Sequence, residues 1–149
     1  MVPLRHEHPE ATTKRILLIE DDDAIRLCPS KILKHGGFEV LTATDGRQGM
    51  ILFQKHAFDL VITDLFMPAQ DGAETIMAIR GLCTGFKIIA ISGGGKIVRP
   101  EYLEPVVASL GVSCFLMKPF TGERLLAEVN AILDDVTPPH WQRGDVASK

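Results

Sequence analysis

The sequence predicts an α/β fold in which helices cover both faces of a parallel sheet. Short apolar runs rich in β-branched residues alternate with longer segments of helical period, which is the pattern of repeated βα units. The first, third and fourth runs are almost wholly apolar, as is typical of central strands, whereas polar interruptions in the second and fifth suit the edges of a sheet. The expected strands are Ile16 to Ile19, Glu39 to Ala43, Leu60 to Thr63, Ile88 to Ser92 and Val112 to Met117.

Helical segments are expected between and after these strands, at Ala24 to His35, Gly46 to His56, Ala73 to Leu82, within Pro100 to Leu110, and at Glu123 to Leu133. Asp23 is a candidate N-cap for the first helix and Gly36-Gly37 a candidate end, while Thr121 is a candidate N-cap for the last helix. Pro29 and Pro105 fall inside the first and fourth helices. Because each proline removes a backbone donor, a kink or a late start is expected there.

Length and composition indicate one domain between two polar tails. The chain has 149 residues, of which 46% are hydrophobic, and this is enough to bury a substantial core. We expect a domain over residues 15–135, a disordered N-terminal tail at 1–14 and a C-terminal tail at 136–149. No run approaches the roughly 20 apolar residues of a membrane span, and the first residues lack the core of a signal peptide, so a cytoplasmic protein is expected.

Charge and cysteine content narrow the expected partners. A formal net charge of -3 and a pI near 5.9 argue against direct binding of nucleic acid and favour a protein or a small anion. The cysteines, at positions 28, 83 and 114, are odd in number and far apart, so neither a disulfide framework nor a metal knuckle is indicated. Buried free thiols are the expectation.

Polar residues gather where the predicted strands end. The first strand runs into Glu20-Asp21-Asp22-Asp23, the third into Asp64, the fourth into Ser92 and the fifth into Lys118. Functional groups of such sheets collect at the carboxyl ends of the strands, so these side chains are expected in one pocket. Clustered carboxylates repel one another unless a divalent cation or a lysine compensates their charge. Mg²⁺ suits the set because it accepts a few carboxylate oxygens, keeps several waters and commonly bridges to phosphate.

These residue types suit phosphoryl transfer, in which catalysis rests on positioning and charge neutralisation. Asp64 is the candidate nucleophile that would form an acyl phosphate. Glu20 and Asp21 are candidate metal ligands. Lys118 would meet one phosphoryl oxygen, and the Ser92 hydroxyl would donate a hydrogen bond to another.

Five ordered segments resemble the receiver domain of bacterial two-component response regulators, the CheY-like domain. They are Ile16 to Asp23, Val61 to Pro68, Asp71-Gly72, Ile89 to Ser92 and Phe115 to Phe120. The resemblance covers about Arg15 to Leu133 and implies a flavodoxin-like fold with strand order 2-1-3-4-5. It also implies Mg²⁺-dependent phosphorylation of Asp64 by a sensor histidine kinase or a histidine phosphotransfer protein.

The resemblance assigns further roles. The Phe66 carbonyl would supply a metal ligand beside Glu20, Asp21 and Asp64, and Ser92 and Phe115 would form a switch in which the aromatic ring turns inward. The Lys118-Pro119 peptide is expected to be cis. The implied protein is a single-domain regulator, not an enzyme, that assists its own phosphorylation and dephosphorylation. It would switch the binding of a downstream protein or relay phosphate.

Two departures and three alternatives accompany this interpretation. The glycine-rich stretch between Ser92 and Lys118 is longer than is usual in this family, and this obscures the fourth helix. Gly94 offers no side chain to orient a hydrolytic water, which predicts slow self-dephosphorylation.

A phosphohydrolase with an aspartyl nucleophile would need a second aspartate where Phe66 stands. A flavin-binding protein would need a phosphate loop after the first strand. A receiver-like scaffold that is never phosphorylated is the remaining alternative.

Overall fold

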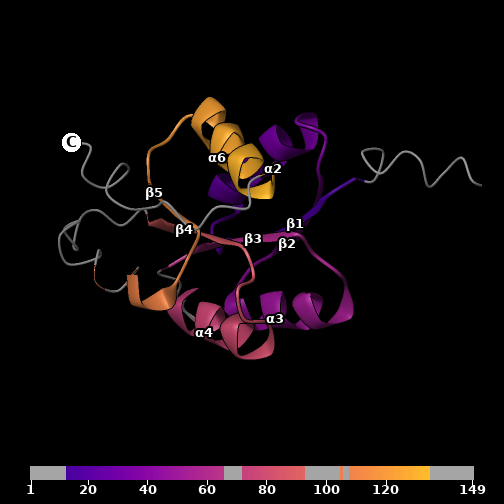
Figure 1. Cartoon of the computed structure of the whole chain (residues 1–149). Coiled ribbons are helices and arrows are strands. Elements are labelled where there is room, and N and C mark those ends of the chain that lie inside the picture. The colour runs from indigo at the N-terminus through magenta and orange to yellow at the C-terminus, as the bar shows by residue number, and fades with distance from the viewer. Residues whose placement is uncertain (1–12, 66–71, 93–104, 106–107, 135–149) are drawn as a thin grey trace, which may run out of the picture.

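The computed structural model describes residues 13–65, 72–92, 105 and 108–134, and these form one α/β domain (Figure 1). In chain order the elements are β1 Arg15–Ile19, α2 Asp23–His35, β2 Glu39–Ala43, α3 Gly46–Lys55, β3 Leu60–Asp64, α4 Gly72–Leu82, β4 Ile88–Ser92, β5 Cys114–Met117 and α6 Gly122–Asp134. Most of the helix expected within Pro100 to Leu110, and most of both expected tails, lie outside the described residues.

All five strands are parallel and follow the order β2-β1-β3-β4-β5, so the expected flavodoxin-like topology is confirmed. The two runs with polar interruptions are the edge strands β2 and β5, as expected. The central strands β1, β3 and β4 are covered on both sides, with α2 and α6 on one face of the sheet and α3 and α4 on the other (Figure 1).

Alternation along each strand divides the core between the two faces. On β1, Leu17 and Ile19 point into the core beneath α3 and α4, while Ile16 and Leu18 point into the core beneath α2 and α6. All four side chains are essentially inaccessible to solvent. Burial on both faces is why these strands read as continuous apolar runs in the sequence.

The first helix begins one residue earlier than expected, and its cap differs from the prediction. Asp22, not Asp23, is the N-cap, and its carboxylate accepts a hydrogen bond from the Ile25 amide at 3.1 Å. Asp23 instead occupies the first helical position, where its carboxylate pairs with Arg26 three residues along the helix. An N-cap residue needs extended backbone and a side chain that accepts from the first turn of the helix. In the run of four acidic residues from 20 to 23, the sequence alone does not show which residue has that backbone.

The remaining predicted helix signals can be compared directly. Helix α2 ends at His35 with Gly36 as its C-cap, and Gly37 has a φ of 97°, as expected for a glycine termination. Thr121 Oγ1 accepts a hydrogen bond from the Arg124 amide at 2.9 Å, which confirms this N-cap for α6. Helix α2 runs from Asp23 through Pro29, so the expected late start is wrong; packing against β1, β2 and α6 supports the helix despite the missing donor.

The predicted absence of disulfides is confirmed for all three cysteines, but their predicted burial is confirmed for only one. Cys114 on β5 is buried, whereas Cys28 on α2 and Cys83, just after α4, are exposed. All three are free thiols. Cys28 lies on the solvent side of an amphipathic helix, and the apolar context of a short sequence window did not distinguish that side from the core.

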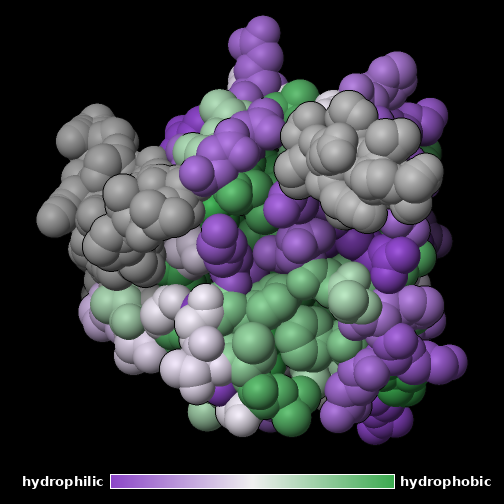
Figure 2. All heavy atoms as spheres, turned by 45° about the vertical axis from the view of Figure 1, so that its right-hand side comes forward, coloured by the Kyte–Doolittle hydropathy of each residue, from purple (hydrophilic) through white to green (hydrophobic). Residues whose placement is uncertain are grey.

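Apolar side chains are also exposed on the helices. The large hydrophobic residues that are exposed in the described part of the chain are Ile25, Leu27, Ile51, Met77 and Leu82. An apolar area occupies the lower half of Figure 2, on the side of the molecule where α3 and α4 lie in Figure 1. Among the described helices, none is long and apolar enough to cross a membrane.

Helix α4 begins in direct contact with the end of β3. The Gly72 amide donates a hydrogen bond to the Leu65 carbonyl at 2.9 Å. A Cβ atom added to Gly72 would lie 1.9 Å from the Asp64 carbonyl oxygen and 2.8 Å from Leu65 Cα. These neighbours are main-chain atoms, which cannot rotate away as a side chain could. Only glycine therefore allows α4 to begin this close to Asp64.

We predict that Gly72→Ala lowers the free energy of unfolding by about 2 to 3 kcal/mol, because the methyl group would push the start of α4 away from β3. Urea unfolding measures this change. Gly81→Ala is the matched control, since a Cβ at Gly81 meets nothing within 4 Å. The control should be neutral, or stabilising by up to about 1 kcal/mol through helix propensity. Equal stability of Gly72→Ala and wild type would contradict the prediction.

Candidate functional site

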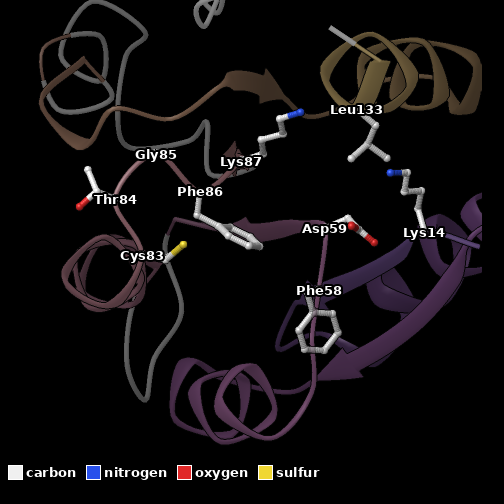
Figure 3. A pocket seen from close by; sticks show the side chains of 9 residues that line it. All are labelled: Lys14, Phe58, Asp59, Cys83, Thr84, Gly85, Phe86, Lys87 and Leu133. Atoms are coloured by element: carbon white, nitrogen blue, oxygen red, sulfur yellow. The ribbon is translucent and has the colours of Figure 1, made fainter. Parts of the chain in front are cut away.

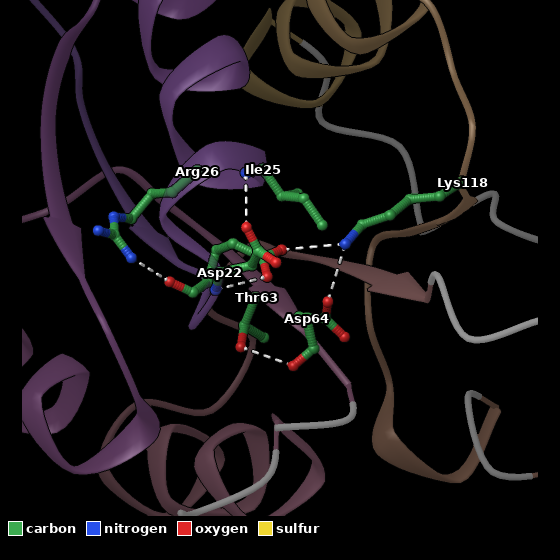
Figure 4. A network of polar contacts seen from close by, with 7 residues as sticks. Asp22, Ile25, Arg26, Thr63, Asp64 and Lys118 are labelled. Atoms are coloured by element: carbon green, nitrogen blue, oxygen red, sulfur yellow. Dashed lines mark hydrogen bonds and ion pairs between the residues drawn. The ribbon is translucent and has the colours of Figure 1, made fainter. Parts of the chain in front are cut away.

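The ends of four strands bring the predicted site residues to one edge of the sheet. Asp64 is the last residue of β3 and Ser92 the last of β4, while Glu20 directly follows β1 and Lys118 directly follows β5. Glu20, Asp64 and Ser92 are buried. Figure 4 shows Asp64 and Lys118 pointing toward one another from β3 and from the segment after β5. Parallel strand direction alone explains this convergence.

Three carboxylates form a group with the geometry of a cation site. One oxygen from each of Glu20, Asp21 and Asp64 lies within 4.8 Å of the others. Glu20 and Asp64 are buried, and Asp21 is exposed toward solvent. Hard oxygen ligands that leave one side open to water suit Mg²⁺, which binds through one or two carboxylates and retains several waters. The residues present therefore fit the metal that the sequence predicted.

Lys118 lies between the two buried carboxylates. Its ammonium nitrogen is 3.0 Å from Glu20 Oε1 and 3.0 Å from Asp64 Oδ2. About a fifth of the lysine side chain, 19%, is exposed, against 5% for Glu20 and 8% for Asp64. A charge pair this far from bulk water is screened much less than a surface pair. Lys118 therefore offsets the repulsion between Glu20 and Asp64.

The balance of burial and charge perturbs two of these groups. Burial raises the pKa of Glu20 to about 7, the hydrogen bond from Lys118 opposes this rise, and the nearby charge of Asp64 adds to it. Burial alone would lower the pKa of Lys118, but its hydrogen bonds to Asp64 and Glu20 outweigh burial and raise that pKa. The lysine is therefore held as a cation, while Glu20 is poised to exchange a proton near neutral pH.

The main chain around Glu20 is fixed by three further contacts. The Glu20 amide donates to the Ala43 carbonyl at 3.1 Å, which ties the residue to the end of β2. The Asp22 amide donates to Glu20 Oε2 at 3.2 Å. Arg26 Nη1 donates to the Glu20 carbonyl at 2.7 Å. The sequence interpretation missed Arg26, although its place three residues after Asp23 on an expected helix is a signal for a local ion pair.

Ser92 and Phe115 lie in the core beside the site. The Ser92 carbonyl accepts a hydrogen bond from the Lys118 amide at 2.9 Å, so the ends of β4 and β5 are joined. Phe115 is 2% exposed and packs into the core beneath α3 and α4. The ring is therefore inward in this structure. The Lys118-Pro119 peptide is cis, as expected. Phe66 and Gly94 lie outside the described residues.

A hollow of about 330 Å³ lies at the opposite edge of the sheet, near the starts of β1, β3 and β4 (Figure 3). Its lining residues are Lys14, Phe58, Asp59, Cys83, Thr84, Gly85, Phe86, Lys87 and Leu133. The Asp59 carboxylate accepts a hydrogen bond from the Arg15 amide at 2.8 Å and so joins two strand starts. None of the predicted site residues lines this hollow. Glu20, Asp64, Ser92 and Lys118 lie at the other edge of the sheet, where the strands end.

Comparison with known proteins agrees with this geometry. Residues 16–130 match the family described as the response regulator receiver domain. The chain is 31% identical to the chemotaxis protein CheY of Bacillus subtilis over 121 residues, which is 80% of this chain and 98% of that protein. A CheY-like receiver domain from Methanospirillum hungatei has a TM-score of 0.75 and 28% identity, and the match covers 83% of this chain and 95% of that one.

Larger regulators share the same region. The transcriptional regulatory protein CpxR of Escherichia coli is 32% identical over 127 residues, which is 85% of this chain but 51% of CpxR. The chain thus spans about half the length of several curated relatives that it matches. The family match over residues 16–130 includes Glu20, Asp21, Asp64 and Lys118. With five parallel strands in the expected order and the family match over residues 16–130, the chain belongs to the response regulator receiver domain family.

Proposed function

We propose that this receiver domain accepts a phosphoryl group on Asp64 from a phosphohistidine of a sensor histidine kinase or a histidine phosphotransfer protein, in a Mg²⁺-dependent reaction. The observation that carries the proposal is the position of Lys118, whose ammonium lies 3.0 Å from both Asp64 and Glu20 inside a group of three carboxylates. A strand-end aspartate that merely faced solvent would need neither a half-buried lysine nor two acidic neighbours.

The site residues divide the work of the transfer. One Asp64 oxygen forms a bond to phosphorus while the bond between phosphorus and the imidazole nitrogen breaks; the phosphohistidine ring carries a proton on its other nitrogen, so it leaves as neutral imidazole. Lys118 releases its ion pair with Asp64 and binds an equatorial phosphoryl oxygen. Glu20, Asp21 and Asp64, with the Phe66 carbonyl, would hold Mg²⁺, which when bound supplies charge neutralisation for the transferring group. The protein's own contribution is positioning.

A response to the new charge follows from the same arrangement. The Ser92 hydroxyl would donate a hydrogen bond to a phosphoryl oxygen on Asp64, since Ser92 ends the strand next to β3. Phe115, two residues before the end of β5, would report this movement to the surface. We propose that the domain acts as a single-domain regulator without catalytic turnover of its own, either switching a protein partner or passing phosphate on.

A protein partner is supported by the surface of α2. Ile25 and Leu27 are 40% and 56% exposed, and the Ile25 amide donates a hydrogen bond to the carboxylate of Asp22, the residue after the candidate metal ligand Asp21. Apolar side chains next to a charged site give a partner protein contact area that a small phosphodonor does not need. The net charge of -3 adds no support for a nucleic-acid partner.

The proposal predicts that acetyl phosphate with Mg²⁺ adds one phosphoryl group to the wild-type protein and none to Asp64→Asn, because the amide is not a nucleophile. Intact-mass spectrometry gives the result directly. Asp59→Asn, directly before the start of β3, is the matched control and should be modified like wild type. An unmodified wild type would support the scaffold alternative, and modification of Asp64→Asn would place the phosphoryl group elsewhere.

A second prediction concerns pH. Glu20, whose pKa is raised to about 7 by burial, is protonated below that pH, and a cation must then displace the proton. The dissociation constant for Mg²⁺ should therefore rise by up to about tenfold for each pH unit below 7 and change little above it. Titration calorimetry between about pH 6 and about pH 8 measures this dependence.

The control for the pH prediction is Glu20→Gln. The amide cannot titrate, so this variant should bind Mg²⁺ more weakly at high pH but lose most of the pH dependence. A dissociation constant of the wild type that stays flat across the same range would contradict the assignment of Glu20 as the titrating group.

A further inference from the structure

Arg26 connects helix α2 to the main chain of the acidic segment. Its Nη1 donates a hydrogen bond to the Glu20 carbonyl at 2.7 Å, which is the dashed line drawn from Arg26 in Figure 4. Its Nη2 pairs with the Asp23 carboxylate. The side chain is only 17% exposed, against 88% for Asp23. The guanidinium therefore lies in a partly buried position, with its planar fork divided between a carbonyl and a carboxylate.

The two peptide groups that flank Asp21 are both held by hydrogen bonds. The preceding peptide is held through the Glu20 carbonyl, which accepts from Arg26. The following peptide is held through the Asp22 amide, which donates to Glu20 Oε2 at 3.2 Å. Asp21 itself is exposed, so the direction in which its carboxylate leaves the chain depends on these two peptide planes.

The two holding contacts differ in what a cation does to them. Both Glu20 oxygens already accept hydrogen bonds, Oε1 from Lys118 and Oε2 from the Asp22 amide, so a cation bound by this carboxylate would compete with one of these contacts. The contact from Arg26 goes to a carbonyl and does not compete with the ligand oxygens. Arg26 is therefore the contact that can keep Asp21 in place while a metal is bound.

We propose that Arg26 is a positioning residue for the Mg²⁺ site: it fixes the peptide between Glu20 and Asp21 and thereby aims the Asp21 carboxylate at the metal. The inference rests on the proposed function, in which Glu20 and Asp21 bind Mg²⁺. It goes beyond it because Arg26 binds neither metal nor phosphate.

Charge and geometry make opposite predictions for Arg26, and this makes the idea testable. If the residue acted through its charge, it would repel the metal, and its removal would tighten Mg²⁺ binding. If it acts through position, its removal loosens Asp21 and weakens binding, because partners that orient metal ligands typically contribute about tenfold or more to affinity.

The experiment measures Mg²⁺ affinity by titration calorimetry for wild type, Arg26→Met and Arg26→Lys. Methionine removes the charge, while lysine keeps it but replaces the fork with a single nitrogen. If Arg26 acts by positioning Asp21, the dissociation constant for Mg²⁺ should be about tenfold higher in Arg26→Met and should also be higher in Arg26→Lys. Lys31→Met, which removes one charge from an exposed site on the same helix, should bind like wild type.

A second readout separates positioning from loss of fold. In the reaction with acetyl phosphate, the Mg²⁺ concentration giving half the maximal rate should rise about tenfold in Arg26→Met, while the rate at saturating Mg²⁺ stays near wild type. A variant that is destabilised but still folded without metal would keep the wild-type Mg²⁺ dependence and would not show that division. If Arg26→Met fails to fold without metal, Arg26→Lys carries the test.

Unchanged or tighter Mg²⁺ binding in Arg26→Met would overturn the inference, as would wild-type affinity in Arg26→Lys. Those outcomes leave the proposed function intact, because wild type would still bind Mg²⁺ and accept phosphate. Absence of Mg²⁺ binding by the wild type would instead overturn the proposed function and this inference with it.

Discussion

Two carboxylates, Glu20 and Asp64, are buried at one edge of the sheet, and the ammonium of Lys118 between them is the interaction on which the site depends. A buried, unpaired carboxylate is costly, so both acids are tolerable at this position only with a compensating charge. One lysine compensates one acid, and burial, with a smaller contribution from the charge of Asp64, raises the pKa of Glu20. Three carboxylates and one lysine leave an excess of negative charge at this edge of the sheet, which suits the binding of a divalent cation.

Much of the fold follows from the strand pattern. The apolar runs that became β1, β3 and β4 are buried on both faces, and the polar interruptions in the other two runs correctly marked the edges. Because the carboxyl ends of parallel strands share one edge, the positions of Glu20, Asp64, Ser92 and Lys118 also followed from the sequence. Strand order came from the family resemblance, since local periodicity carries no information about which strands are neighbours.

The predictions that were wrong concern single contacts whose partners are set by three-dimensional packing. Asp22 rather than Asp23 caps α2, because the cap depends on which residue adopts extended backbone. Cys28 is exposed because the helix turns it away from the core. Arg26 was missed for a related reason: its partner is a main-chain carbonyl, and the residue sequence does not show which carbonyls at a strand end lack a neighbouring strand.

The contact of Gly72 with the Asp64 carbonyl has a mechanical consequence. Side chains between packed elements can absorb a small displacement by rotating, but here main chain meets main chain with no side chain between. We therefore expect any displacement of the end of β3 to displace the first turn of α4 with it. Met77 and Leu82 lie farther along the same helix and are exposed, so the helix whose first residue contacts the acidic edge also presents apolar side chains at the surface.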